Sequence, residues 1–353
     1  MTGGRREGAA AGQKLGFFDH RGRRVAYATA GGRGTPLLCD LGRIQHLDVF
    51  WRYPPYRRLV EALAGHFMVI RVDRPGCGLS DRGGADFSID GELTLFDRLL
   101  DELDLDDTAI LSAGTSAPAS IATAALRPRR VSRLAVFGAC ARHVPETGDY
   151  GSSIEVLLRT RFELATEVLA RERAAGSDAA AVRWLAAAYR ESAPAEVMVD
   201  LVRESRRLDA RPLLGRVRCP TLVLHRRDDP SVPFQCGRDV AAGIRGAVLL
   251  PVDGAAGLIW EGDVESLLAP AMRFLSDGGE PGPPVPGPSL TAREREVGRL
   301  VAAGLTNTDI AQRLGIGRRT VESHVEHARN RLGLVSRAEL AAWIMRERDE
   351  NAR

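Results

Sequence analysis

Short apolar runs alternate with stretches of helical periodicity over most of the chain. Seven of these runs have the length and residue types of buried strands, at residues 25–28, 36–39, 68–72, 109–111, 134–137, 221–225 and 248–251. Helical periodicity lies between them, for example at residues 56–64, 93–102 and 117–126. Strands that alternate with helices in this way predict an α/β fold with a mainly parallel sheet and helices on both faces.

One long stretch departs from this alternation. Between residues 145 and 214 the chain carries no strand signal and is rich in Ala, Arg and Glu with helical periodicity. An all-helical insertion placed at about the sixth strand predicts a lid over the C-terminal edge of the sheet.

Two polar segments bound this α/β part. Residues 1–14 are small and polar, which predicts a disordered leader. Residues 276–289, SDGGEPGPPVPGPS, favour an extended linker, because a segment so rich in Gly and Pro holds neither a helix nor a central strand. The expected domains are therefore residues 15–275 and residues 290–353, the second long enough for one small domain.

The C-terminal tail has the pattern of four short helices. The first begins at a capping box formed by Thr291 and Glu294, and Thr306 caps the second. The third is expected over residues 318–332 and the fourth over residues 337–346. Two helices joined by a tight turn that contains Gly are typical of a helix-turn-helix.

The third of these helices has one apolar face and one polar face. Its apolar residues recur at i, i+4, i+7 and i+11, at positions 321, 325, 328 and 332. When such a helix enters the major groove, the polar face meets base edges and flanking cations meet phosphates. The expected DNA-binding residues are Arg318, Arg319, Thr320, Glu322, Ser323, Glu326, Asn330 and Arg331, with Thr306 and Asn307 at the start of the preceding helix.

The tail resembles the LuxR-type helix-turn-helix along the whole of LTAREREVGRLVAAGLTNTDIAQRLGIGRRTVESHVEHARNRLGLVSRAEL. This resemblance implies a four-helix domain that binds DNA as a dimer, with dimer contacts through the last helix. Members of the family often carry Lys where this chain has Glu322 and Glu326. Because a carboxylate accepts from cytosine N4 but repels phosphate, we expect a different operator and a greater dependence on dimerisation. The alternative is a helical bundle with no role in DNA binding.

Three motifs in the larger part resemble the α/β-hydrolase superfamily. DRPGCGLSD at residues 73–81 follows an apolar strand, and TLVLH at residues 221–225 precedes DDPSVP at residues 228–233. A third, LIWEGD, lies at residues 258–263. The resemblance covers roughly residues 15–275 and is closest to the hydrolase-like modules found fused to regulators and nucleotide cyclases.

The residues that hydrolysis needs on such a fold are mostly missing. The chemistry requires a Ser on a strained elbow, followed in chain order by an acid and a His. The elbow position falls on Gly114, and the His position falls on Gly257 in a region with no His between His225 and His324. Only the acid position is filled, by Asp229, which we interpret as a loop-capping residue. These residues predict a domain that is not an enzyme.

Two other nucleophiles are conceivable in this part of the chain. Ser116 is flanked by Thr115 and Pro118, a poor elbow, so a helix N-cap serine is the favoured interpretation. Cys77 lies in a glycine turn that is more typical of a buried thiol. Asp40 stands where a His-Gly pair usually contributes to the oxyanion hole, and a carboxylate there would repel developing negative charge.

A pocket is expected between the sheet and the lid, the usual ligand location in such folds. Loss of the Ser and His side chains should leave it larger and more apolar, which favours a sensor for a small, largely apolar metabolite. Two alternatives are a working esterase that uses Ser116 and carries a DNA-binding appendage, and a ligand-free block that serves only oligomerisation. The pocket candidates are Asp40, Leu41, His46, Gly114, Thr115, His143, Asp229, Gly257 and Trp260.

Composition and charge narrow the remaining choices. A net charge of +3 is only mildly basic, so nucleic-acid binding must come from a local arrangement of charge. The five cysteines are spaced neither as a zinc site nor as a CxxC pair, which predicts reduced thiols in a cytoplasmic protein without metal or cofactor. No apolar run is long enough for a membrane span. The expected partners are double-stranded DNA, a small-molecule ligand, further copies of the chain in a homodimer or higher oligomer, and RNA polymerase, with no membrane.

Overall fold

The chain forms two compact units, residues 1–282 and residues 283–353. The computed structural model describes residues 12–32, 34–142, 150–276, 292–332 and 336–350. Apart from Ser276, the predicted linker at residues 276–289 lies outside these described residues.

An eight-stranded sheet is the centre of the first unit. Its strands are β1 (Lys14–His20), β2 (Arg23–Ala30), β3 (Thr35–Asp40), β4 (Phe67–Val72), β5 (Thr108–Ala113), β6 (Val131–Phe137), β7 (Thr221–Arg226) and β8 (Val248–Val252). In the order β1-β2-β4-β3-β5-β6-β7-β8, the β1–β2 and β2–β4 pairs are antiparallel and the other pairs are parallel. The predicted α/β class is confirmed, and the carboxyl ends of β3 to β8 share the edge at which open α/β sheets bind ligands.

Helices cover both faces of this sheet, because successive buried strand residues point to opposite faces. Leu37 and Leu111 pack in one core cluster with α2 and α10, whereas Leu38 and Ile110 pack in a second with α3, α4 and α9. No helix in the described segments is long and apolar enough to cross a membrane. The helices around the sheet are α1 (Leu47–Trp51), α2 (Pro54–Ala64), α3 (Ile89–Glu102), α4 (Ala117–Leu126), α9 (Phe234–Gly243) and α10 (Glu265–Leu275), with 3-10 turns η1 (Gly114–Ser116) and η2 (Arg211–Arg216).

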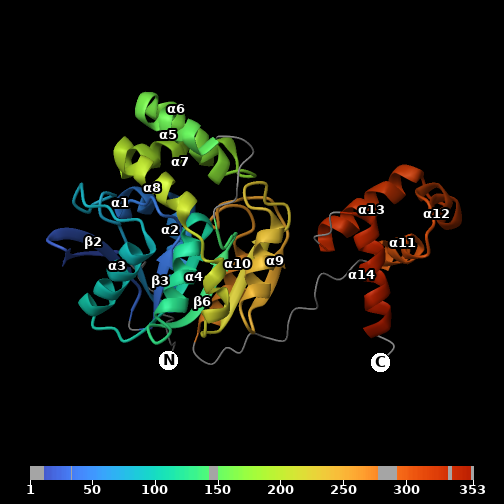
Figure 1. Cartoon of the computed structure of the whole chain (residues 1–353), viewed down its shortest axis with the longest axis horizontal. Coiled ribbons are helices and arrows are strands. Elements are labelled where there is room, and N and C mark those ends of the chain that lie inside the picture. The colour runs from blue at the N-terminus through green and yellow to red at the C-terminus, as the bar shows by residue number, and fades with distance from the viewer. Residues whose placement is uncertain (1–11, 33, 143–149, 277–291, 333–335, 351–353) are drawn as a thin grey trace, which may run out of the picture. The chain divides into compact units, whose positions relative to one another are not determined.

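Four helices between β6 and β7 gather over one end of the sheet domain (Figure 1). Their buried residues, such as Leu158, Ala165 and Met198, form an apolar cluster with Ile44 and Phe87 from the loops at the sheet edge. This lid consists of α5 (Tyr150–Thr160), α6 (Phe162–Arg173), α7 (Ala179–Ser192) and α8 (Ala195–Arg207). It therefore packs on the carboxyl ends of the strands through apolar contacts of its own.

Asp73 organises the turn that follows β4. Its carboxylate accepts from the backbone N–H groups of Leu47 at 3.1 Å and Leu79 at 2.8 Å. Gly78 has φ +55°, and a Cβ atom at that position would lie 2.0 Å from Asp73 Oδ2, so the turn requires glycine. Burial raises the pKa of Asp73 to about 7, although these hydrogen bonds act in the opposite direction.

Four buried or nearly buried charged side chains join β3, the β4 turn and α3. Glu92 accepts from Arg43 Nη2 at 2.9 Å and from Arg74 Nε at 2.8 Å. Arg74 Nη2 also donates to Asp40 Oδ2 at 2.8 Å. Burial disfavours the charged form of Glu92, yet Arg74 and Arg43 hold its pKa below the usual value. The carboxylate of Asp40, expected to repel negative charge at the sheet edge, is thus paired with a guanidinium.

The second unit consists of helices around a small apolar core. Val297, Ile310, Val321 and Leu340 are buried there, one from each helix. Thr306 and Asp309 form a capping box at the start of the second helix. The predicted box of Thr291 with Glu294 lies outside the described residues, because Thr291 is not described. The helices are α11 (Ala292–Ala302), α12 (Asn307–Leu314), α13 (Arg318–Leu332) and α14 (Arg337–Glu350).

The predicted leader over residues 1–14 is wrong at its last two positions. Lys14 opens β1, and Gln13 Oε1 accepts a hydrogen bond from Arg71 Nη2. Residues 1–11 lie outside the described part. The sequence pattern did not reveal β1 because it is an edge strand with a mostly exposed pattern, interrupted by Gly16.

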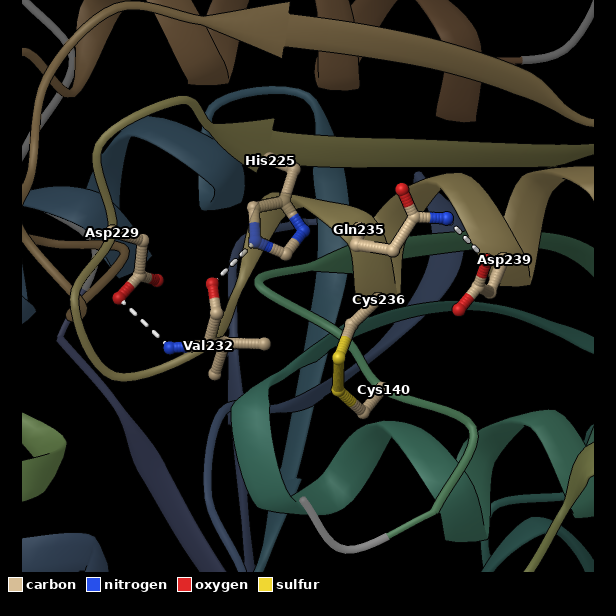
Figure 2. Close-up of a disulfide and its surroundings, with 7 residues drawn as sticks. All are labelled: Cys140, His225, Asp229, Val232, Gln235, Cys236 and Asp239. Carbon is tan, nitrogen blue, oxygen red and sulfur yellow. Dashed lines mark hydrogen bonds between the residues drawn. A yellow bond between two sulfur atoms is a disulfide. The ribbon is translucent and has the colours of Figure 1, made fainter. Parts of the chain in front are cut away.

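The expectation of five reduced thiols is wrong for two of them. Cys140, after β6, forms a disulfide with Cys236 at the start of α9 (Figure 2), and the two lie 96 positions apart in sequence. Parallel strands bring these loops together at the same sheet edge, which sequence spacing does not reveal. Cys39, Cys77 and Cys219 are free and buried.

Replacing Glu92 by Ala tests the buried ion network. Glu92→Ala leaves the guanidinium groups of Arg43 and Arg74 buried without their shared carboxylate, and we expect a loss of about 3–5 kcal/mol in the free energy of unfolding. Urea denaturation of the N-terminal unit measures it. The matched control is Glu102→Ala, which removes the more exposed i,i+4 pair with Arg98 and should cost at most about 1 kcal/mol. Equal effects of the two variants would contradict the role assigned to Glu92.

Candidate functional site

Gly114 lies at the turn between β5 and α4, where the elbow of this kind of fold is expected. Its φ is +55°, the left-handed backbone that a strained elbow needs. Glycine offers no nucleophile there. The space above it is filled: a Cβ atom on Gly114 would lie 2.1 Å from Nη2 of Arg173 and 2.4 Å from its Cζ.

Arg173 comes from the last turn of lid helix α6. Its Nη1 donates to the carbonyl oxygen of Gly257 at 3.0 Å. One guanidinium thus lies over the elbow position and contacts the position where a catalytic His is expected. Sequence reasoning missed Arg173, because it lies among other arginines of a helical segment and belongs to no motif. We expected loss of the Ser and His side chains to leave the pocket larger and more apolar, but the guanidinium of Arg173 lies over the elbow position instead.

Gly257 is closely packed by the chain around it. Its N–H donates to the carbonyl of Ala175 at 2.8 Å. A Cβ atom on Gly257 would lie 2.7 Å from Ser231 Oγ and 2.8 Å from the carbonyl oxygen of Arg173. Because one of these atoms belongs to the backbone, a larger side chain at this position requires the lid connection to shift.

Asp229, at the expected acid position, holds its own loop together (Figure 2). Its Oδ1 accepts from the N–H of Ser231 at 2.8 Å, from Ser231 Oγ at 2.6 Å and from the N–H of Val232 at 3.1 Å. The nearby His225 ring instead contacts the carbonyl of Val232 through Nε2 at 2.9 Å. The geometry is that of a loop-capping carboxylate, as expected from the sequence.

Ser116 and Cys77 are poorly placed to act as nucleophiles. Ser116 is fully buried, and its Oγ donates to Asp40 Oδ1 at 2.8 Å. It occupies the N-cap position of α4 but makes no side-chain cap hydrogen bond, so the expected capping role is corrected to a bond with Asp40. Burial raises the pKa of the Cys77 thiol to about 12, which leaves it protonated near neutral pH.

A cavity of about 270 Å³ lies between the strand ends and the lid. Four of the predicted pocket residues line it: Leu41, Gly114, Thr115 and Trp260. It also touches residues that the sequence did not single out, namely Arg43, Cys140, Arg173, Tyr189 and Ser231, among others.

The other predicted pocket residues are placed elsewhere. Asp40 is bonded to Arg74 and Ser116 away from this cavity, and Asp229 is engaged by its own loop. His46 caps α1, because its Nδ1 accepts from the N–H groups of residues 48 and 49, and burial lowers its pKa. Gly257 contributes its carbonyl to Arg173 but does not line the cavity. His143 lies outside the described residues.

The expected reading face of α13 is partly exposed, and Glu322 on it is half-buried. Arg319, Thr320 and Glu326 are exposed, while Val321 and Val325 on the opposite face are buried. This division agrees with the predicted phase of the helix. Ser323 is half-buried, and the side chains of Asn330 and Arg331 lie outside the described ones.

Four of the predicted DNA-binding residues have side-chain partners within the unit: Arg318 and Glu322 with each other, Asn307 with Arg337, and Thr306 with Asp309. Arg318 Nε donates to Glu322 Oε1 at 2.9 Å, so the unusual acid is paired one turn away. Asn307 Oδ1 accepts from Arg337 Nη1 at 2.7 Å, which ties the start of α12 to α14. Thr306 is exposed and belongs to the capping box.

Comparison with known proteins separates the two units. Residues 288–344 match the model of the family described as bacterial regulatory proteins, luxR family. The nitrate/nitrite response regulator protein NarL of Escherichia coli K12 is 48% identical over 59 residues, which are 17% of this chain and 27% of NarL. The likeness to that relative is thus confined to about a quarter of its length.

The larger unit is similar to hydrolases. The putative carbamate hydrolase RutD of Azorhizobium caulinodans is 28% identical over 250 residues, covering 68% of this chain and 90% of RutD. Among solved structures, the enol-lactonase from Burkholderia xenovorans LB400 superposes with a TM-score of 0.64 at 20% identity, over 74% of this chain and 99% of that one. At this identity the likeness establishes the α/β-hydrolase fold alone.

The disulfide beside the cavity can be tested by reduction. Opening the Cys140–Cys236 bond, which spans 96 positions, should destabilise the N-terminal unit by up to about 4–5 kcal/mol, because the unfolded chain loses a long loop constraint. Melting curves with and without dithiothreitol measure the effect. Cys140→Ser should melt identically in both conditions, and Cys219→Ser, which changes a free thiol, should keep the full response to reduction. A reductant effect of the same size in Cys140→Ser would contradict this assignment.

Proposed function

We propose that this chain, a LuxR-type helix-turn-helix domain joined to an α/β-hydrolase fold, is a DNA-binding transcription regulator whose hydrolase-like domain binds a small ligand instead of catalysing hydrolysis. The observation that carries the proposal is the arginine over the elbow: Arg173 stands where a nucleophile's side chain would begin. On this proposal, a ligand binds in the cavity under the lid, and its binding changes how the helix-turn-helix domain binds DNA.

The absence of catalysis rests on all three triad positions together. A Ser nucleophile needs a His base, and the His needs an acid to hold its tautomer. Here positions 114 and 257 are glycine, and Asp229 serves its own loop. The similarity to RutD argues for shared ancestry of the fold, and the altered positions argue against shared chemistry.

The ligand-binding role rests on the cavity that remains. It lies at the carboxyl edge of a parallel sheet and is covered by the lid, the location at which such folds bind small molecules. A domain kept only for oligomerisation has no need of such a space. Ligand occupancy would change how the lid packs and thereby how two copies of the chain associate on DNA.

The DNA-binding role rests on α13. Its exposed face carries Arg319 and Thr320, and its buried face packs on the domain core through Val321 and Val325. We infer that this helix enters the major groove of double-stranded DNA as part of a homodimer, in the cytoplasm, and that the regulator acts on transcription by RNA polymerase. Because Arg318 pairs with Glu322, the reading face repels DNA phosphates less strongly than two unpaired glutamates would.

DNA binding is tested with the protein and a fragment of its own upstream region. Arg319→Ala should weaken specific binding by about 1–3 kcal/mol, because an exposed guanidinium at the start of the reading helix is lost. Gel shifts at several salt concentrations give the affinity and its salt dependence. Arg299→Ala removes an exposed charge from α11 and is the matched control, expected to bind as the native protein does. Equal losses in both variants would argue against α13 as the reading helix.

Hydrolysis is tested with 4-nitrophenyl esters. The native protein should show no turnover above buffer, and the double variant Gly114→Ser/Gly257→His should remain inactive, because both new side chains meet Arg173. Turnover by the native protein that disappears in Ser116→Ala would overturn the proposal in favour of an esterase that uses that serine. A known esterase of the same fold serves as the positive control for the assay.

A further inference from the structure

We propose that the cavity under the lid takes an amphipathic acid, a small molecule with an apolar body and one carboxylate that pairs with the guanidinium of Arg173. This inference rests on the proposed ligand-binding function and names the chemical class of the ligand. It also replaces the expectation of a purely apolar metabolite, because the vacated catalytic space holds a cation.

The first support is the incomplete pairing of Arg173. Its Nη1 donates to the Gly257 carbonyl, and within the described part of the chain this is the one hydrogen-bond partner recorded for its side chain. The Nη2 edge lies over Gly114, which has no side chain to meet it, and both residues line the cavity. A guanidinium has five N–H donors, and here one of them meets a neutral carbonyl. The remaining N–H groups can donate two parallel hydrogen bonds to a planar carboxylate.

The second support is the sign of charge on the cavity wall. Among the described lining residues there are four arginines, Arg43, Arg142, Arg173 and Arg206, and a single acid, Glu172. Arg43 and Arg206 have carboxylate partners elsewhere, in Glu92 and Glu155. Among the described residues Arg173 has no carboxylate partner, and it is the lining arginine that lies over the elbow at Gly114.

The third support is the orientation of α4. This helix of ten residues begins at Ala117, directly after Gly114 and its two neighbours, so its N-terminus points toward the same end of the cavity. The partial positive charge of a helix N-terminus favours anions. The helix and Arg173 come from different elements, and both favour negative charge at the same place.

The rest of the cavity wall indicates what the uncharged part of the ligand is made of. It is mostly apolar, with side chains from the sheet edge and from all four lid helices, for example Leu41, Ile154, Leu169, Leu185, Leu201 and Trp260. A neutral apolar ligand would cover the charge of Arg173 without a counter-charge, which is unfavourable. A strongly hydrated anion without an apolar body would leave this wall unfilled. An acid with a hydrocarbon or aromatic body satisfies both ends.

The experiment uses the full-length protein and three acids with apolar bodies: octanoate, 3-phenylpropionate and indole-3-acetate. Each is compared with its uncharged primary amide, and phenyl phosphate separates a carboxylate site from a general anion site. Isothermal titration calorimetry and thermal shift measure binding. We expect at least one acid to bind, its amide to bind at least about tenfold more weakly, and phenyl phosphate not to replace it.

Three variants assign the effect to Arg173. Arg173→Gln should weaken binding of the acid by about tenfold to a hundredfold while leaving the weak binding of the amide unchanged. Arg173→Lys should restore part of the affinity, since it keeps the charge but loses the fork. Arg171→Gln changes an exposed arginine on the same helix that does not line the cavity, and should bind as the native protein does.

The outcomes separate this inference from the proposed function. If none of the acids binds up to its solubility limit, if the amides bind as tightly as the acids, or if Arg173→Gln binds the acids unchanged, the carboxylate assignment is wrong. Amides that bind and alter DNA affinity would still support a ligand-controlled regulator. If neither set binds and the cavity-filling variant Val202→Trp leaves DNA affinity unchanged, the ligand-binding function itself fails.

Discussion

A guanidinium from the lid lies at the point where the central strand β5 turns into α4. Arg173 reaches over Gly114 and donates to the carbonyl of Gly257, so one side chain joins the lid to two loops of the sheet. The two glycines and the arginine depend on one another, because a side chain at either glycine would meet Arg173 or its backbone. A side chain at Gly114 would require the flexible guanidinium of Arg173 to move aside, whereas a side chain at Gly257 would meet the backbone carbonyl oxygen of Arg173.

Arginine also shapes the loop that carries Gly257. Arg226, at the end of β7 and nearly fully buried, donates to the carbonyls of Ala256, Leu258 and Glu261. Burial lowers its pKa, yet Asp229 and other nearby carboxylates favour its charged form. The backbone around Gly257 is thus held from one side by Arg226 and from the other by Arg173. Two residues of this loop, Leu258 and Trp260, line the cavity.

The two units of the chain use charge differently. In the larger unit, two buried arginines have carboxylate partners: Arg43 and Arg74 share Glu92, and Arg74 also binds Asp40. In the smaller unit, Arg319 stays exposed on the reading helix, while Arg318 is paired with Glu322. A buried charge without a partner is costly, so a guanidinium beside the cavity that lacks a carboxylate favours an anionic ligand. On the reading face, an exposed guanidinium such as Arg319 is free to contact DNA.

The order of strands and helices, the helix-turn-helix of the tail and the missing Ser and His could all be predicted from the sequence, because they depend on local periodicity, capping and residue identity. Strand β1 could not, since an exposed edge strand has no strong alternation. The Cys140–Cys236 bond, the pairing of Asp40 with Arg74 and the placement of His46 as a cap depend on contacts between distant segments. The same holds for Arg173, which belongs to no motif and meets Gly114 only because the lid folds over the sheet edge. Local sequence determined that positions 114 and 257 are glycines, and tertiary packing alone decided that the guanidinium of Arg173 lies over Gly114 and bonds to Gly257.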